Sequence, residues 1–216
     1  MPTIFEAKID GSNAIRYFHF SLVEFYLEQA YVNSTQAKED QEPNHLLASS
    51  IMGIMFSAMA LEAFANEISE EIIPKEDLKS FIHLRKGYKK LQGESSVLAK
   101  LRILFKEKFN HDLDSDAKSG LEKLTSLRNN LVHYKLSDLA GKYIMPPVGN
   151  MDVGGGQKML TIDFMQKPER VEPPFIQEVT GDAALECFNH AYSVIETWNS
   201  LISKKEQDSG NDVSTR

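Results

Sequence analysis

A long amphipathic helix dominates the first third of the chain. Between residues 47 and 72, apolar side chains recur in alternating steps of four and three residues. This spacing places them on one face of a helix, and that face must be covered by other helices. The members of this apolar stripe are Leu47, Ile51, Ile54, Ala58, Leu61, Ala65, Ile68 and Ile72. Met52, Met55, Phe56 and Met59 widen the stripe, so we expect this helix to be central and buried.

The same periodicity and the usual capping residues predict the other helices. Helix-spaced apolar residues such as Ile15 and Phe25 indicate a first helix, and Pro74, Ser95 or Ser96, and Asp114 suit the starts of three more. A last helix carries an apolar face made by Ala184, Phe188, Ala191, Ile195, Trp198 and Ile202. The predicted ranges are 14–33, 74–92, 95–109, 114–135 and a final helix through about residue 204.

The segment from Ser137 to Thr180 interrupts this helical pattern. It is rich in glycine and proline, which favour turns and loops. Within it, apolar residues alternate between Lys158 and Gln166, which predicts a short strand or hairpin. A connection of this length inside a compact domain is usually functional or mobile.

These elements predict an all-α fold: a bundle of five to six helices with a long Gly/Pro-rich insertion, including a short β-hairpin, before the last helix. A chain of 216 residues suits one domain, which we place at residues 1–205 with the insertion at 137–180. The polar residues 206–216 are predicted to form a disordered tail.

Composition points to a soluble protein of a reducing compartment. The chain is 42% hydrophobic and 25% charged, close to globular averages, and Cys187 is its one cysteine. No secretion signal begins the sequence. The apolar run from Leu46 to Leu61 is interrupted by serines and is too short to cross a bilayer, so we expect a cytoplasmic protein with no membrane segment.

The net charge of −7 argues against a protein that coats nucleic acid indiscriminately. The charge is nevertheless uneven, because residues 75–135 hold 14 Lys/Arg against 8 Asp/Glu, a local balance of +6. Two interpretations stay open for this stretch: a local anion-binding site, or an ordinary solvated helix face.

Several other chemistries find no support in the sequence. The glycines from Gly149 to Gly156 are followed by Gln157, Lys158 and Met159 and then by strand-like residues, so they fit a hairpin tip and not a phosphate-binding loop. No two histidines have metal-ligand spacing, and no nucleophile signature is present. We therefore expect no metal and no cofactor, and Cys187 fits a small core residue.

Glu62 is the one charged residue between Ile51 and Ala65. A buried carboxylate is costly unless it is paired or hydrogen-bonded, so this position is a candidate helper at a functional site. The alternative is a residue at the edge of the helix, beside the apolar stripe.

The residues Arg128 to His133 are the sharpest functional signal. Arg128 falls within the apolar face of its predicted helix, near Val132, and must reach solvent or find an anion. Asn129 and His133 share the opposite, polar face, while Arg128 and His133 are about 140° apart at 100° per residue. One straight helix therefore does not bring the guanidinium and the imidazole together, whereas a second copy packed across a twofold axis could. An ordinary amphipathic helix with a basic C-terminal end explains the same residues.

The stretch Leu127-Arg128-Asn129-Asn130-Leu131-Val132-His133-Tyr134 resembles the Arg-polar-x3-His signature of the HEPN superfamily. A second segment, Phe56 to Ile68, is similar to the helix that precedes the motif helix in several HEPN-like proteins. The resemblance covers roughly residues 14–135 and, loosely, the last helix.

This resemblance implies a helical bundle that dimerises so that two motif helices face each other. It further implies a metal-independent endoribonuclease of toxin–antitoxin or phage-defence systems, with RNA as substrate and an antitoxin or nucleotidyltransferase-type partner. By position, His133 would act as general acid or base, and Arg128 would hold the scissile phosphate. Asn129 would orient His133 or the phosphate. Attack by the 2′-OH would leave a 2′,3′-cyclic phosphate.

The chain also departs from this family pattern. In the subgroup modified on tyrosine the histidine is followed at the second position by tyrosine, whereas here Tyr134 follows His133 directly and Lys135 comes next. The insertion lies outside the resemblance. Some HEPN domains are non-catalytic modules for nucleotide or RNA binding or for dimerisation, which is the alternative function.

Overall fold

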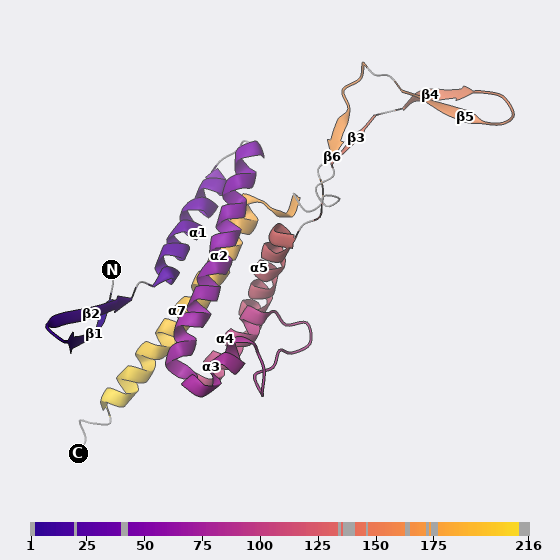
Figure 1. The fold of residues 1–216 in the computed structure, drawn as a ribbon. Helices are drawn as coiled ribbons and strands as arrows, with labels where there is room; N and C mark the ends of the chain where they lie inside the picture. Colours follow the sequence, from indigo (N-terminus) through magenta and orange to yellow (C-terminus); the bar gives the residue numbers. More distant parts are fainter. Residues whose placement is uncertain are drawn as a thin grey trace.

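The protein is an all-α bundle from which two β arms project (Figure 1). The structure, a computed structural model, describes residues 3–19, 21–39, 43–133, 135, 141–145, 147–162, 165–171, 173 and 177–211. Its six helices in these residues are α1 (Leu22–Glu39), α2 (Pro43–Ile72), α3 (Lys75–Ile82), α4 (Ser96–Phe109), α5 (Ser115–His133) and α7 (Gly181–Asn211). The prediction of a helical bundle with a small hairpin in the insertion is confirmed.

Helix α2 is the centre of the bundle and contacts α1, α3, α4, α5 and α7. In Figure 1, α1 and α5 lie on either side of α2, and α7 runs behind it. The lower part of the core is aromatic, because Trp198 of α7 meets Phe64, Phe105 and Phe109 with ring centroids 4.7–5.8 Å apart. Edge-on packing of these rings suits their charge distribution and fixes α7 against α2 and α4.

Most of the apolar stripe predicted for α2 is buried. Ile54, Ala58, Leu61, Ala65 and Ile68 are in the core, Ile51 and Ile72 are half-buried against it, and the side chain of Leu47 lies outside the described part. The widening of this stripe by methionines is partly wrong: Met52 is 45% exposed, and Met55, Phe56 and Met59 are half-buried. The bundle therefore covers these four residues only in part, with Phe56 packing against Phe25 and Tyr26 of α1.

By length and composition, residues 48–72 of α2 would also qualify as a membrane span. However, 56% of the apolar window is buried inside the bundle. A central helix surrounded by other helices has this character, so the apolar composition of α2 fits its place at the core of the bundle.

The N-terminal residues differ from the prediction. Strand β1 (Thr3–Asp10) pairs antiparallel with β2 (Asn13–His19) through a turn at Gly11, and α1 begins only at Leu22. The helical prediction for residues 14–19 is therefore wrong. The spacing of Ile15 and Phe18 suits a helix locally, but pairing with residues 3–10 satisfies the backbone instead. At the start of α1, the Leu22 N–H donates to Glu67 of α2 at 3.2 Å.

Helix α3 is shorter than predicted, because it ends at Ile82 and not near Gln92. Leu84, Lys86 and Gly87 all have positive φ, which breaks the helix. A helix through Lys90 would also set Arg85 above Lys89 and Lys86 above Lys90, and like charges four residues apart repel. The next helix starts as predicted, since the Ser95 hydroxyl accepts the Leu98 N–H at 3.3 Å.

The insertion forms an arm of two small antiparallel sheets. Strand β3 (Lys142–Ile144) pairs with β6 (Glu169–Val171), and β4 (Pro147–Asp152) pairs with β5 (Lys158–Ile162). The predicted strand at Lys158 and the glycine turn at Gly154–Gly156 are confirmed. Figure 1 shows this arm leaving the bundle beyond the end of α5.

Helix α7 is also longer than predicted. Residues 206–211 continue the helix, so the predicted disorder is wrong for these residues, and residues 212–216 lie outside the described part.

Candidate functional site at the end of α5

The helix that carries the Arg-Asn-x3-His motif is built as its sequence predicts. The Asp114 carboxylate accepts the Ala117 N–H at 2.7 Å, which confirms Asp114 as the cap of α5. Leu121, Leu124 and Leu127 are buried and hold the helix against the bundle. Towards the C-terminus the helix emerges: Leu131 is half-buried and Val132 is 45% exposed. The motif therefore stands where α5 leaves the core.

Arg128 finds its anion within the same chain. Its Nη2 lies 3.5 Å from Oε1 of Glu62 on α2, and its Nη1 donates to Oδ1 of Asn129 at 3.2 Å. The two charged side chains are 30% and 43% exposed, respectively. The structure thus joins two residues that the sequence singled out separately, and it holds the guanidinium near the surface where α2 and α5 are in contact.

A second cation faces Glu62. Lys100 of α4 is half-buried, and its pKa is lowered, chiefly because burial disfavours the ammonium, while the negative charge of Glu62 acts in the opposite direction. Glu62 therefore forms an ion pair with Arg128 and interacts electrostatically with Lys100, and it is neither a fully buried acid nor an isolated helix-edge residue.

Asn129 and His133 are exposed on the outer side of α5. His133 is the last residue of the helix, and Tyr134 lies outside the described residues. With α5 regular through His133, the angle of about 140° between Arg128 and His133 persists. One chain brings together Glu62, Arg128 and Asn129, and it leaves the imidazole on another side of the helix.

A partly exposed apolar surface adjoins this ion pair. We call it the α2 outward face, formed by Met52, Met55, Phe56, Met59 and Ala63 and ending at Glu62 and Asn66. On the α1 side, the ring of Tyr26 stacks on Phe56 with centroids 6.1 Å apart, and Phe25, which is 49% exposed, meets Phe56 edge-on at 6.4 Å. A hollow of about 360 Å³ lies at its lower end, lined by Leu22, Tyr26, Met59, Glu62, Ala63, Asn66 and Glu67.

The sequence analysis missed two features near the motif. One is Lys100, whose relation to Glu62 depends on helix packing and carries no local signal. The other is the exposed loop His83–Lys90, hereafter the basic loop, which was predicted to be part of the helix 74–92. Its glycine and the density of its cations were the available signals.

The remaining candidates are structural. Among the described residues, no three His, Cys, Asp or Glu side chains are grouped as metal ligands. Cys187 is buried in α7 as expected, and burial raises the pKa of its thiol to about 12. His190 packs against Gly120 of α5 and lies 3.6 Å from Glu186, which in turn bonds Lys123.

Comparison of the chain with protein-family models, with curated proteins and with solved structures finds no match. The resemblance to HEPN proteins therefore rests on the motif, on the segment Phe56–Ile68 and on the helical architecture.

Proposed function

We propose that the protein is a metal-independent endoribonuclease of the HEPN type that acts as a homodimer. The observation that carries the proposal is the placement of the motif: Arg128 is held by Glu62 and Asn129 at the exposed end of α5, and His133 follows five residues later on an accessible side. A cytoplasmic toxin or phage-defence component, with an antitoxin or nucleotidyltransferase-type partner, is the setting that the resemblance suggests.

The α2 outward face supports the pairing of two copies. Met52 on this face and Phe25 of α1, which packs against Phe56, are exposed apolar side chains, and contiguous apolar surface of this kind favours association. Closing two such faces across a twofold axis would set two motif helices side by side. The shared site would then contain Arg128 and His133 of both copies, a set of side chains that one chain cannot supply.

In this site the ribose 2′-OH attacks the adjacent phosphorus, and the bond from phosphorus to the 5′-oxygen breaks. The imidazole of one His133 accepts the 2′-OH proton, and that of the second copy donates a proton to the leaving oxygen. Arg128 stabilises the charge that develops on the phosphoryl oxygens. The products are a 2′,3′-cyclic phosphate and a 5′-hydroxyl, and DNA cannot react because it lacks the attacking group.

The experiment is cleavage of a labelled RNA in EDTA by the wild-type chain, His133→Ala, Arg128→Ala and the matched control His111→Ala. His111 is an exposed histidine outside the motif. We expect the motif variants to lose cleavage by about 10²–10⁴-fold, the usual contribution of general acid–base catalysis, and the control to retain it. An inert wild type, or equal activity of His133→Ala, would disprove the enzymatic function.

One observation favours a second candidate, a non-catalytic HEPN-like module for RNA binding or dimerisation. In the single chain Arg128 already has an anionic partner, so a phosphate must compete with Glu62 for the guanidinium. A chain that dimerises and binds RNA without cleaving it would match this alternative.

A further inference from the structure

The basic loop is the most concentrated positive charge of the chain. Its eight residues contain Arg85, Lys86, Lys89 and Lys90, together with His83, and no acid. All five of these side chains are exposed. Because the whole chain carries −7, this local charge needs a reason beyond solubility.

The loop is held in one conformation. Leu84 and Lys86 have φ of 50° and 49°, a region that costs of order 1 kcal/mol for residues with a side chain and persists only when the surroundings enforce it. The ring of Tyr88 packs edge-on against Phe81 with centroids 5.4 Å apart. Arg102 of α4 donates to the Lys89 carbonyl at 3.2 Å.

A buried ion pair supports the loop from beneath. Arg102 bonds both carboxylate oxygens of Glu94 at 2.8 and 3.2 Å, and their side chains are only 18% and 6% exposed. Glu94 also accepts the Leu91 N–H at 2.7 Å. The backbone of the basic loop is therefore fixed before any ligand arrives, which spares the ordering cost of binding.

The segment that follows the loop contacts α5 on the side that carries Asn129 and His133. The Ser95 N–H donates to Glu122 at 2.8 Å, and the hydroxyls of Ser95 and Thr125 are 3.5 Å apart. Asn129 and His133 follow Glu122 by seven and eleven residues, respectively. At 100° per residue, the three side chains therefore lie within about 40° of one another around α5. The distance from Glu122 to His133 along the axis is about 16 Å at 1.5 Å per residue.

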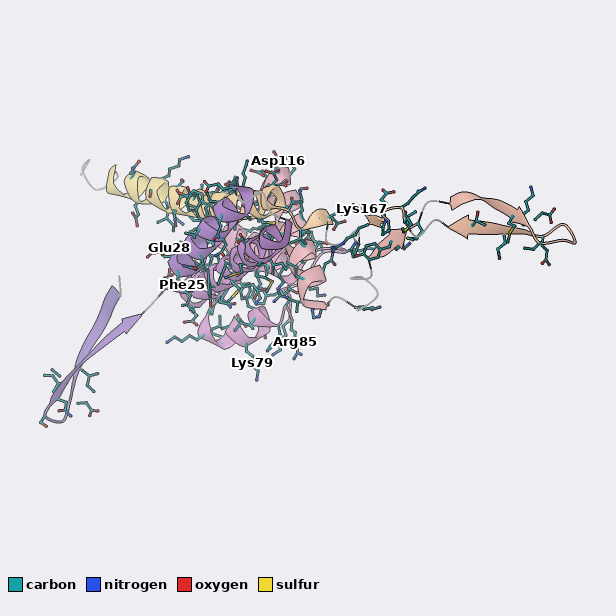
Figure 2. All side chains as sticks on the ribbon, turned by 90° about the horizontal axis from the view of Figure 1, so that it is seen from above. Phe25, Glu28, Lys79, Arg85, Asp116 and Lys167 are labelled. Atoms are coloured by element: carbon teal, nitrogen blue, oxygen red, sulfur yellow. The ribbon has the colours of Figure 1, made fainter. Side chains whose placement is uncertain are left out.

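Two cations of this region project from one side of the bundle. Figure 2 shows Lys79 and Arg85 pointing outward there, opposite Asp116. Beside them, Lys89 and Lys90 line an open hollow of about 550 Å³ with Ile82, His83, Leu84 and Ser96.

We infer that the basic loop binds the phosphate backbone of the RNA whose scissile bond lies at Arg128 and His133. The inference rests on the proposed function for the identity of the ligand. A chain of phosphates presents regularly spaced negative charge, which suits four cations within six residues, and a preformed backbone places them without reading bases. An acidic protein segment is the competing occupant.

The test is binding of a fluorescent single-stranded RNA to full-length protein that carries His133→Ala, so that cleavage does not interfere. Lys89→Gln/Lys90→Gln is compared with Lys142→Gln/Lys158→Gln, which removes two exposed lysines of the β arm. Each affinity is measured between low and moderate salt, and a single-stranded DNA of the same sequence forms a second arm. Thermal unfolding checks that both double variants are folded.

We expect the loop variant to bind RNA about tenfold more weakly and to lower the salt slope by about 1.4, since each phosphate contact on a single strand contributes about 0.7. The arm variant should match the parent. DNA binding with the same dependence on the loop would support recognition of phosphates. Unchanged RNA affinity and slope in the loop variant would overturn the inference, as would a parent protein that binds no RNA at low salt, which would favour the acidic protein segment.

The two proposals fail separately in these experiments. If the chain binds RNA through the loop but never cleaves RNA, the basic loop is a binding surface and the proposed enzymatic function is wrong. If substitution of Lys89 and Lys90 leaves cleavage unchanged, the proposed enzymatic function stands and the proposed role of the loop is wrong.

Discussion

Arg128 of α5 and Glu62 of α2 form an ion pair between the two helices, with Nη2 of the guanidinium 3.5 Å from Oε1 of the carboxylate. This ion pair connects the motif helix to the central helix at the end of the α2 outward face. Both side chains are partly exposed, so the pair contributes at most about 1 kcal/mol to stability. Its main effect is to orient the guanidinium.

Removing the Glu62 charge should therefore change the site more than the fold. We expect Glu62→Gln to leave the free energy of unfolding within about 1 kcal/mol of wild type. The pKa of Lys100 should fall further, since burial already lowers it and the Glu62 charge is what opposes that effect. Lysine side-chain NMR as a function of pH measures this directly, and an unchanged Lys100 pKa would contradict the coupling.

The lowered pKa of Lys100 also sets the sign of a pH dependence of stability. The folded chain disfavours the charged Lys100, so below its ordinary pKa of 10.5 the unfolded chain binds the proton better. Its contribution to stability therefore rises as the pH approaches 10.5 from below. Denaturant titrations of Lys100→Met and wild type at pH 7 and pH 10 isolate this contribution to the free energy of unfolding. We expect wild type to gain stability relative to the variant at pH 10, and an unchanged difference between the two pH values would contradict the prediction.

Dimerisation through the α2 outward face should depend on its apolar residues. Phe25→Asp and Met52→Asp place a charge on exposed positions of this face, where burial in an interface would leave it unpaired. We expect both variants to shift the chain from twice its 24.4 kDa mass towards the monomer in analytical ultracentrifugation. Tyr192→Asp, at a position of similar exposure on α7, is the matched control. If the control and the face variants behave alike, this face is not the interface.

Gly120 should be intolerant of a side chain. A Cβ at this position would lie 2.6 Å from Cε1 of His190 on α7, closer than real contacts allow. Gly120→Ala should cost about 1–3 kcal/mol of unfolding free energy, as overpacking does. In a His190→Ala background most of this cost should disappear, and thermal or denaturant unfolding of the four chains completes the cycle. Additive effects would show that the close approach is not the cause.

The support of the basic loop should weaken in acid. Burial opposes ionisation of Glu94, but hydrogen bonds from Arg102 and Leu91 outweigh it and keep its pKa below the ordinary 4.5. The stabilisation is complete above pH 4.5 and is lost as the pH falls through the depressed pKa. Hydrogen exchange should show faster opening of the Leu91 amide in Glu94→Gln at neutral pH, because its acceptor changes. Equal protection in the variant would mean that other contacts hold the loop.

Cys187 should be inert in the folded protein. Its thiol is buried and its pKa is about 12, so very little thiolate forms at pH 8. A thiol reagent should react slowly with the native chain and rapidly in denaturant. Because the folded pKa is raised, stability should decline as the pH rises from the ordinary value of 9.0 towards 12.

Local pattern was sufficient for much of the bundle. The four-three spacing from Ile51 to Ile68 encodes which side of α2 is buried, because the helical period leaves only one face for a core. Ser95 and Asp114 mark helix starts through hydrogen bonds to N–H groups three residues away, so these starts could be read without tertiary information. The motif Arg128-Asn129-Asn130-Leu131-Val132-His133 was likewise visible as a spacing on one helix.

The tertiary structure alone decided what depends on distant residues. Whether residues 13–19 form a strand was settled by pairing with residues 3–10, and whether residues 83–90 leave the helix was settled with help from Arg102 and Phe81. The partner of Arg128 could not be read from the chain either, because Glu62 reaches it only when α2 and α5 pack. The short-range pattern of the sequence encodes which face of a helix is buried and where the helix ends. Which charged side chains form ion pairs depends on how the helices pack against one another.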